Sequence, residues 1–93
     1  MRERTIENHL KNRVHALGGI SFKFTSSEAG VPDRVIILFG EVHFVEVKTS
    51  NGRISKIQSI QFSRIENAGG KLWVVRSISD IEAMLHDISQ RHK

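Results

Sequence analysis

The chain has no cysteine, a single proline (Pro32) and no long apolar run. The lack of cysteine excludes disulfide bonds and thiolate metal sites. The longest unbroken apolar stretch, Val35 to Phe39, is far too short to cross a bilayer. The first residues, MRERTIENHL, are charged and amphipathic and lack the apolar centre of an export signal, so we expect a cytoplasmic protein.

Length and charge bound the function only loosely. Of the 93 residues, 39% are hydrophobic and 26% are charged, so we expect residues 1–93 to form one folded domain. A domain of this size buries a small core, which makes self-association a reasonable expectation. The net charge of +4 favours a polyanionic partner such as nucleic acid only slightly, because the basic residues are scattered along the chain.

The pattern of apolar residues and glycines predicts an α/β fold in the order α-β-β-β-α-β-α. The expected elements are a helix over 3–17, strands over 20–25, 33–39 and 42–48, a helix over 55–68, a strand over 71–75, and a last helix opened by the capping box Ser79-Asp80-Ile81-Glu82. The strand–helix–strand segment 42–75 requires a crossover to a parallel partner. We therefore expect a mixed central sheet flanked by helices.

The second and third strands form a predicted hairpin that carries charges in otherwise apolar sequence. If Gly40 and Glu41 are the central turn residues, Asp33 faces Lys48, and Glu46 is a diagonal neighbour of Asp33 on the same face. The Cβ atoms of such diagonal neighbours are about 7–8 Å apart, so both carboxylates can reach a common point. Both faces of the hairpin are apolar, so we expect both to be covered.

Two interpretations of this charged cluster are open. A salt bridge between Asp33 and Lys48 at the solvent edge of the sheet would be purely structural, but a single ion pair does not require the second acid, Glu46. Two carboxylates held close together repel each other and call for a cation, and carboxylate oxygens select a hard ion such as Mg²⁺ or Mn²⁺. Beside such an ion, Lys48 would orient the attacking water or stabilise charge on a phosphodiester.

The order and spacing of several short motifs resemble the PD-(D/E)XK nuclease superfamily, and more narrowly its VRR-NUC branch. The motifs are the opening helix with Ile6-Glu7, the Gly18-Gly19 stop, Lys23 in the first strand, GVPDRVIIL, FVEVKT, GRISKIQ, and Gly69-Gly70 before the last strand. The resemblance covers nearly the whole chain and implies a restriction-endonuclease-like core.

The resemblance also implies roles for residues of the hairpin. Asp33 and Glu46 would bind the metal ion, assisted by the backbone carbonyl of Val47, and Lys48 would be the catalytic lysine. The implied reaction is Mg²⁺- or Mn²⁺-dependent hydrolysis of DNA phosphodiesters, which leaves a 5′-phosphate and a 3′-hydroxyl.

Two positions outside the hairpin stay open. The resemblance implies an acid on the first helix that completes the metal site. Glu7 is the first candidate, although an acid there also suits the helix dipole, and Glu3 is the alternative. The resemblance further implies a glutamine one turn into the second helix, near the catalytic residues. Gln58 fits that place, but it also forms a capping box with Ser55, and Gln61 is the other candidate.

Basic residues near these motifs are candidates for DNA contacts. Lys23 lies one strand from the hairpin and could contact the scissile phosphate, and we add Arg34, Arg53 and Ser55 to the same set, although Ser55 is mainly a helix cap. The histidines show no metal-ligand spacing and are expected at the surface, whereas Trp73 is expected in the core.

The expected function is a structure-selective, metal-dependent endonuclease of a bacterial or phage-infected host cytoplasm. A chain this small offers little surface for recognising base sequence, and a homodimer with one site for each strand would suit branched DNA such as a Holliday junction. The alternatives are a catalytically idle nucleic-acid-binding module and a protein-interaction domain whose acids are merely paired.

Overall fold

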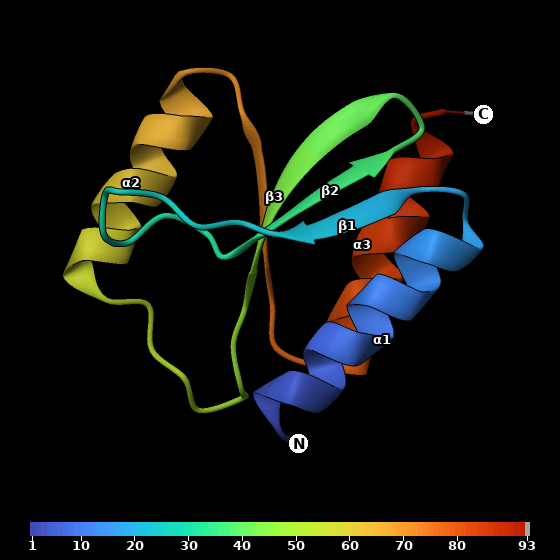
Figure 1. The fold of residues 1–93 in the computed structure, drawn as a ribbon, viewed down its shortest axis with the longest axis horizontal. Coiled ribbons are helices and arrows are strands. Elements are labelled where there is room, and N and C mark those ends of the chain that lie inside the picture. Colours follow the sequence, from blue (N-terminus) through green and yellow to red (C-terminus); the bar gives the residue numbers. More distant parts are fainter. Residues whose placement is uncertain (93) are drawn as a thin grey trace.

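The computed structural model describes residues 1–92 and has seven elements in the predicted order (Figure 1). They are α1 (Glu3–Ala16), β1 (Ile20–Lys23), β2 (Arg34–Leu38), β3 (Glu41–Val47), α2 (Lys56–Asn67), β4 (Lys71–Val75) and α3 (Ile78–Gln90). No helix among the described residues has the length and apolar character needed to cross a membrane.

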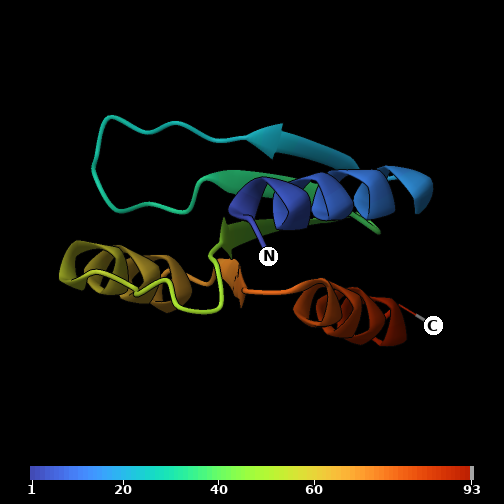
Figure 2. The ribbon, with the colours of Figure 1, turned by 90° about the horizontal axis from the view of Figure 1, so that it is seen from below.

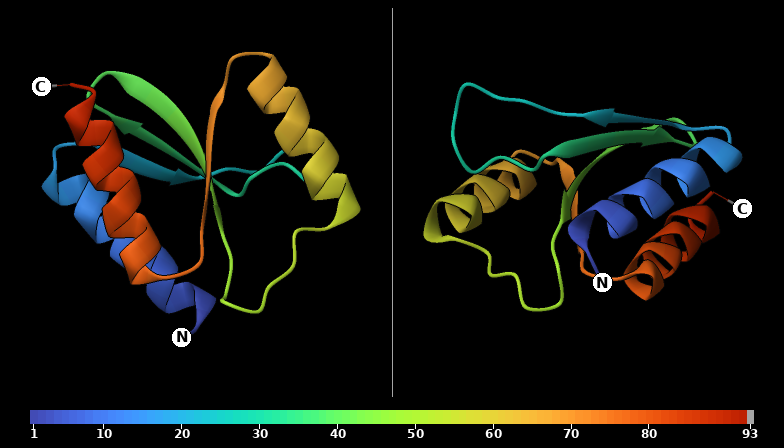
Figure 3. Two further views of the ribbon diagram at one scale, coloured as in Figure 1. Left: turned by 180° about the vertical axis from the view of Figure 1, so that it is seen from behind. Right: turned by 60° about the horizontal axis from the view of Figure 1, so that its bottom comes forward.

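The sheet is mixed, as predicted. Its strands lie in the order β1-β2-β3-β4, and all neighbours are antiparallel except β3 and β4, which are parallel and joined through α2. Helices α1 and α3 lie together on one side of β4 and α2 lies on the other (Figures 1 and 3). Figure 2 shows that the start of β2 and the end of β3 lie between α2 and the pair formed by α1 and α3.

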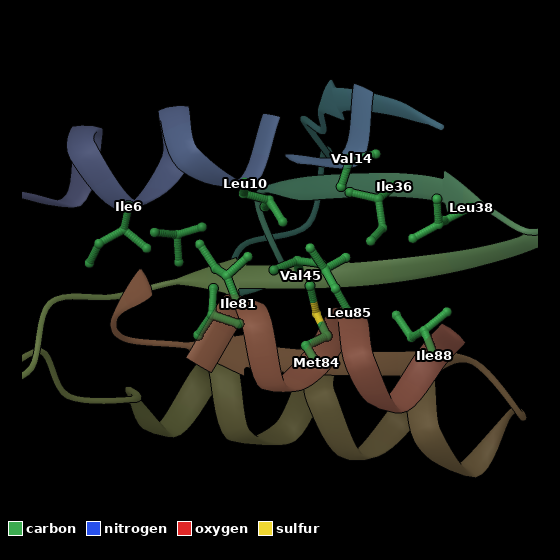
Figure 4. Close-up of a cluster of buried hydrophobic side chains, with 12 residues drawn as sticks. Ile6, Leu10, Val14, Ile36, Leu38, Val45, Ile81, Met84, Leu85 and Ile88 are labelled. Carbon is green, nitrogen blue, oxygen red and sulfur yellow. The ribbon is translucent and has the colours of Figure 1, made fainter. Parts of the chain in front are cut away.

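The core lies between the sheet and the helices α1 and α3. Each helix has an apolar stripe at helical spacing, and Figure 4 shows both stripes pointing toward β2 and β3. The buried cluster consists of Ile6, Leu10, Val14, Ile36, Leu38, Val45, Val47, Val75, Ile81, Met84, Leu85 and Ile88.

The hairpin turn differs from the prediction by one residue. Leu38 pairs with Glu41, so Phe39 and Gly40 are the central turn residues, with φ angles of 51° and 76°. A two-residue hairpin of this kind needs left-handed conformations at both central residues. Glycine suits either position, so Gly40 can be the second central residue here although the prediction made it the first. The prediction that Asp33 faces Lys48 is therefore wrong. The pairing moves by two residues, which leaves every side chain on its predicted face.

The expectation that both faces of the hairpin are covered is also wrong. Ile36 on β2 is fully buried on the face toward α1 and α3. On the other face, Ile37 keeps 37% and Val42 keeps 50% of its surface exposed. Helix α2 packs against β4 and does not extend over the turn end of the hairpin. The apolar character of both faces thus does not predict which of them a helix covers.

Helix α3 begins earlier than predicted. The hydroxyl of Ser77 accepts a hydrogen bond of 3.0 Å from the backbone N–H of Asp80, and the Asp80 carboxylate accepts one of 2.8 Å from the backbone N–H of Arg76. Ser79 is therefore not the cap. Ser77, two residues before Ser79, has the same pattern of a serine followed three residues later by an acid, and it is the N-cap. The helix therefore starts at Ile78.

His43 is fully buried, which corrects the expectation that the histidines lie at the surface. Its Nδ1 accepts a hydrogen bond of 2.9 Å from Nε1 of Trp73, so we assign the proton to Nε2, which lies 3.2 Å from Oε1 of Glu41. Burial lowers the pKa of His43, and the charge of Glu41 opposes this shift. Trp73 packs against the core, as predicted.

The unequal covering of the two sheet faces predicts different results for two neighbouring substitutions on β2. Ile36→Ala removes a fully buried side chain and should lower the free energy of unfolding by about 2–4 kcal/mol. Ile37→Ala, the matched control on the open face, should lower it by less than about 1 kcal/mol. Urea unfolding at low protein concentration measures both values, and equal losses would contradict the assigned faces.

Candidate metal and catalytic site

Asp33 and Glu46 lie beside each other where β2 begins and β3 ends. Asp33 directly precedes β2, and Glu46 is the last residue but one of β3. If the register is continued beyond the pair of Arg34 and Val45, Asp33 lies directly opposite Glu46. The Cβ atoms of directly opposite residues are about 4.5–5.5 Å apart. The corrected turn thus brings the two acids closer than the diagonal arrangement would.

The two oxygens of the Glu46 carboxylate have different surroundings. Oε2 accepts a hydrogen bond of 3.1 Å from Nε2 of Gln58 and lies 3.6 Å from Nζ of Lys48. Oε1 is buried and has no hydrogen-bond partner, and the same is true of Oδ1 of Asp33. Each acid therefore keeps one buried oxygen unsatisfied, which is uncommon for polar atoms in a folded protein.

The electrostatics of the two acids reflect this arrangement. Burial raises the pKa of Glu46, and the neighbouring charge of Asp33 raises it further, against the opposing effect of Lys48. Burial also raises the pKa of Asp33, and the charge of Glu7 adds to the rise. Backbone amides and the charge of Lys23 act in the opposite direction on Asp33. Both carboxylates are therefore destabilised in their charged forms and would be stabilised by a nearby cation.

These residues fit a hard divalent cation. The two unsatisfied oxygens are of the type that Mg²⁺ and Mn²⁺ prefer. Within residues 1–92, no three His, Cys, Asp or Glu side chains gather into a ligand group. The protein would therefore contribute Asp33, Glu46 and the carbonyl of Val47, and water would fill the other positions, as is usual for Mg²⁺.

The first helix contributes Glu7 to the surroundings of the site. The Oε2 atom of Glu7 accepts a hydrogen bond of 2.9 Å from Nη1 of Arg34, and the charge of Glu7 acts on Asp33. Glu3 is exposed at the start of the helix and is not among the groups that shift the pKa of Asp33. Of the two candidate acids, Glu7 is the one whose charge acts on Asp33, and it is already paired with Arg34.

Arg34 is not placed to contact DNA. Its side chain is 6% exposed, and its guanidinium binds Glu7 and the hydroxyl of Ser21. The prediction of a DNA contact at Arg34 is corrected to a buried ion pair that joins α1 to the sheet. The sequence did contain a signal for this burial: alternation along the strand puts Arg34 on the same face as Ile36 and Leu38, and helices cover that face.

The structure separates the two candidate glutamines. Gln58 donates to Glu46 through Nε2, and its Oε1 accepts the backbone N–H of Ser55 in the predicted capping box. Gln61 instead donates to the carbonyl of Ala29 at 3.1 Å and lies near Glu28. Helix α2 thus presents Gln58 to the site, whereas Gln61 holds the loop before Asp33.

The remaining predicted DNA contacts lie around the acid pair. Lys23 ends β1, is exposed, and its charge reaches Asp33. Arg53 is exposed in the loop between β3 and α2, and Ser55 is the N-cap of α2. Arg76 is outside the predicted set, and its contacts with the carbonyls of the loop after Lys48 have no signal in the sequence.

A four-stranded mixed sheet that holds an acid pair and a lysine at one end of its central hairpin is the architecture of PD-(D/E)XK nucleases. The model of the VRR-NUC domain family matches residues 2–78. A solved structure described as a VRR_NUC domain has a TM-score of 0.84 at 30% sequence identity, over 90% of this chain and 94% of that one. The chain therefore belongs to the VRR-NUC family and carries a nuclease domain, which confirms the resemblance found in the sequence.

A phage protein is also similar over nearly its whole length. The protein named "Putative nuclease p44" from Acyrthosiphon pisum secondary endosymbiont phage 1 is 36% identical over 87 residues, which cover 91% of this chain and 92% of that protein.

The repulsion at the acid pair predicts that Asp33→Asn stabilises the metal-free protein. The raised pKa values mean that the folded state binds protons more tightly than the unfolded state, so these groups reduce stability as pH rises above their ordinary values. At pH 7.5 the substitution should raise the free energy of unfolding by about 1 kcal/mol, and the gain should disappear near pH 4.

Urea unfolding in EDTA at the two pH values measures this effect. Asp87→Asn, which neutralises an exposed carboxylate on α3, is the matched control and should leave stability nearly unchanged. A loss of stability in Asp33→Asn at pH 7.5 would contradict the assignment of a strained acid pair.

Proposed function

We propose that the protein is an Mg²⁺- or Mn²⁺-dependent DNA endonuclease that hydrolyses phosphodiesters in structured DNA. The observation that carries the proposal is the division of the Glu46 carboxylate. One oxygen is held by Gln58 and Lys48, while the other, like Oδ1 of Asp33, is buried without a partner. A purely structural salt bridge would leave neither acid unsatisfied.

The residues have separate tasks in this proposal. A divalent ion bound by Asp33 and Glu46 would polarise the phosphodiester and lower the pKa of a bound water. Lys48 carries its ammonium beside the acids, where it orients the attacking water and stabilises the negative charge that develops on the phosphate. Gln58 fixes the rotamer of Glu46. Hydrolysis with cleavage of the P–O3′ bond leaves a 5′-phosphate and a 3′-hydroxyl.

The surroundings of the site favour a nucleic acid substrate of defined shape. Lys23 is exposed and its charge reaches Asp33, Arg53 is exposed in the loop that follows β3, and the chain carries a net charge of +4. A chain of 93 residues offers little surface for base-edge contacts, so selectivity would come from the shape of the DNA. Branched DNA, including four-way junctions, is therefore the proposed substrate class.

Cleavage of labelled duplex, nicked, flap and four-way-junction DNA with Mn²⁺ or Mg²⁺ tests the activity. Lys48→Ala should lower the rate at least about 100-fold. Gln58→Ala should lower it about tenfold because Glu46 loses its orienting contact, whereas Asn67→Ala, which removes an exposed amide at the far end of the same helix, should keep the activity. EDTA should abolish cleavage.

Two outcomes would overturn the proposal. If the wild type binds these DNAs but cuts none of them with either metal, the protein is an idle binding module. If calorimetry detects no binding of Mn²⁺ and the protein neither binds nor cuts DNA, the acids serve a protein-interaction domain. Equal rates for wild type and Lys48→Ala would remove the assigned role of the lysine.

A homodimer is the proposed working form, and the open sheet face supports it. We call this surface the apolar sheet face: it consists of five side chains that are 37–54% exposed, contributed by β1, β2 and β3 and the residue that follows β1. They are Ile20, Phe22, Phe24, Ile37 and Val42. These five side chains are uncharged, so the patch they form is unsuited to phosphates and suited to protein.

The size of the apolar sheet face suits a second copy of the chain. At roughly 200 Å² for each fully exposed aromatic side chain, Phe22 and Phe24 alone expose about 180 Å² of apolar surface, and Ile20, Ile37 and Val42 add to it. A standard interface takes about 800 Å² from each partner, somewhat more than half of it apolar. Phe24 also contacts Phe44, which lies two residues before Glu46 on the same face, so pairing of two copies would hold two acid pairs at a fixed separation.

Phe22→Asp should convert the dimer to a monomer, because it places a charge in the middle of the apolar sheet face. Sedimentation equilibrium at micromolar concentrations measures the mass, and paired cuts in a four-way junction should give way to single nicks. Ala83→Asp, which adds the same charge to the exposed side of α3, should remain dimeric. A monomeric wild type, or a dimeric Phe22→Asp, would overturn this assignment. If wild type and Phe22→Asp are both monomers and the variant binds DNA more weakly, the apolar sheet face contacts DNA instead.

A further inference from the structure

Arg76 follows β4 and reaches across to the loop that comes after Lys48. Its Nη1 donates a hydrogen bond of 3.0 Å to the carbonyl of Thr49 and a second one to the carbonyl of Gly52. The backbone N–H of Gly52 also donates to the Thr49 carbonyl at 3.1 Å, which closes residues 49–52 into a turn. One guanidinium nitrogen thus holds both ends of this turn, which we call the 49–52 turn.

The 49–52 turn packs against the catalytic lysine. A Cβ atom placed on Gly52 would lie 3.3 Å from Cδ of Lys48, so the glycine backbone lies directly against the aliphatic part of that side chain. The backbone of Lys48 is fixed separately, because its N–H donates to the carbonyl of Val75 at 3.0 Å. The backbone of the lysine is therefore set by the sheet, whereas its side chain is packed against the turn that Arg76 holds.

Arg76 is itself held in place. Its backbone N–H is bound by the Asp80 carboxylate in the first turn of α3, and it directly follows Val75 of the β3–β4 ladder. Because Nη1 of Arg76 already donates to two backbone carbonyls, the guanidinium is poorly placed to serve as a general phosphate contact. The connection from α3 through Arg76 and the 49–52 turn ends at the ammonium that lies 3.6 Å from Glu46.

We propose that Arg76 is a positioning residue that holds the 49–52 turn against Lys48 and thereby orients its ammonium beside Glu46. The proposal rests on the proposed nuclease function for its effect on catalysis. Its structural part, the order of the 49–52 turn, is independent of any activity.

The first experiment measures order without DNA. Amide hydrogen exchange by NMR should show the Gly52 amide exchanging at least tenfold faster in Arg76→Ala than in the wild type. The Lys48 amide, bound to Val75, should keep its protection and serves as the internal control. Unchanged exchange at Gly52 would overturn the proposal, as would acceleration throughout the sheet, which would mean that Arg76 only stabilises the fold.

The second experiment measures cleavage under saturating DNA. Arg76→Ala should lower kcat about tenfold or more and leave KM within about twofold, and added guanidinium ion or Arg76→Lys should restore part of kcat. Arg91→Ala, which removes a cation near Glu41 at the turn end of the hairpin, should retain wild-type kcat and KM. A rise in KM at constant kcat would overturn the proposal and make Arg76 a DNA contact.

The two arms separate the possible failures. If the wild type cuts no DNA while the Gly52 amide behaves as expected, the nuclease proposal fails and the hold on the 49–52 turn stands. If the wild type cuts DNA and Arg76→Ala cuts it equally well, the positioning role fails and the nuclease proposal stands.

Discussion

The repulsion between the carboxylates of Asp33, which is partly buried, and Glu46, which is buried, is the constraint around which this end of the sheet is organised. Asp33 and Glu46 are brought together by the pairing of β2 with β3, and that pairing is set by a turn at the far end of the hairpin. Burial and mutual charge raise the pKa of Glu46, and the surroundings supply Lys48 as only partial compensation. Such strain persists in folded proteins where function requires it, at the expense of stability elsewhere. The helices α1 and α3 supply that stability through a core that lies on the opposite face of the sheet.

Much of this fold follows from local patterns in the sequence. The apolar stripe of α1, the double-glycine stops and the alternation along β2 and β3 are short-range signals, and they predict element order, strand direction and the face that carries the acids. The predicted faces are correct although the predicted turn is wrong by one residue. Moving a two-residue turn by one position shifts the strand pairing by two residues, and side chains alternate between the faces with a period of two. The proximity of Asp33, Glu46 and Lys48 was predicted correctly for the same reason: strand neighbours on one face stay neighbours in either register.

The features that were missed depend on contacts between residues far apart in the chain. Whether α2 covers the outer face of the hairpin depends on how the crossover between β3 and β4 packs. The sequence does not reveal this, because both faces of the hairpin are apolar. Arg34 resembles a surface cation until Glu7, on another element, is placed beside it. His43 resembles a solvent-exposed strand residue until Trp73 provides a donor for its ring. In each case a polar side chain is buried because a partner satisfies it, and one sequence without its fold does not reveal the partner.

Gln58 performs two tasks with the two ends of one amide. Its oxygen completes the capping box of α2, and its nitrogen donates to Glu46. A capping box accepts glutamate as readily as glutamine at this position, but a glutamate would bring a third carboxylate against Glu46 and leave Oε2 with Lys48 as its one partner. Slow deamidation of Gln58 to glutamate would therefore leave the cap of α2 intact but increase the repulsion at the acid pair.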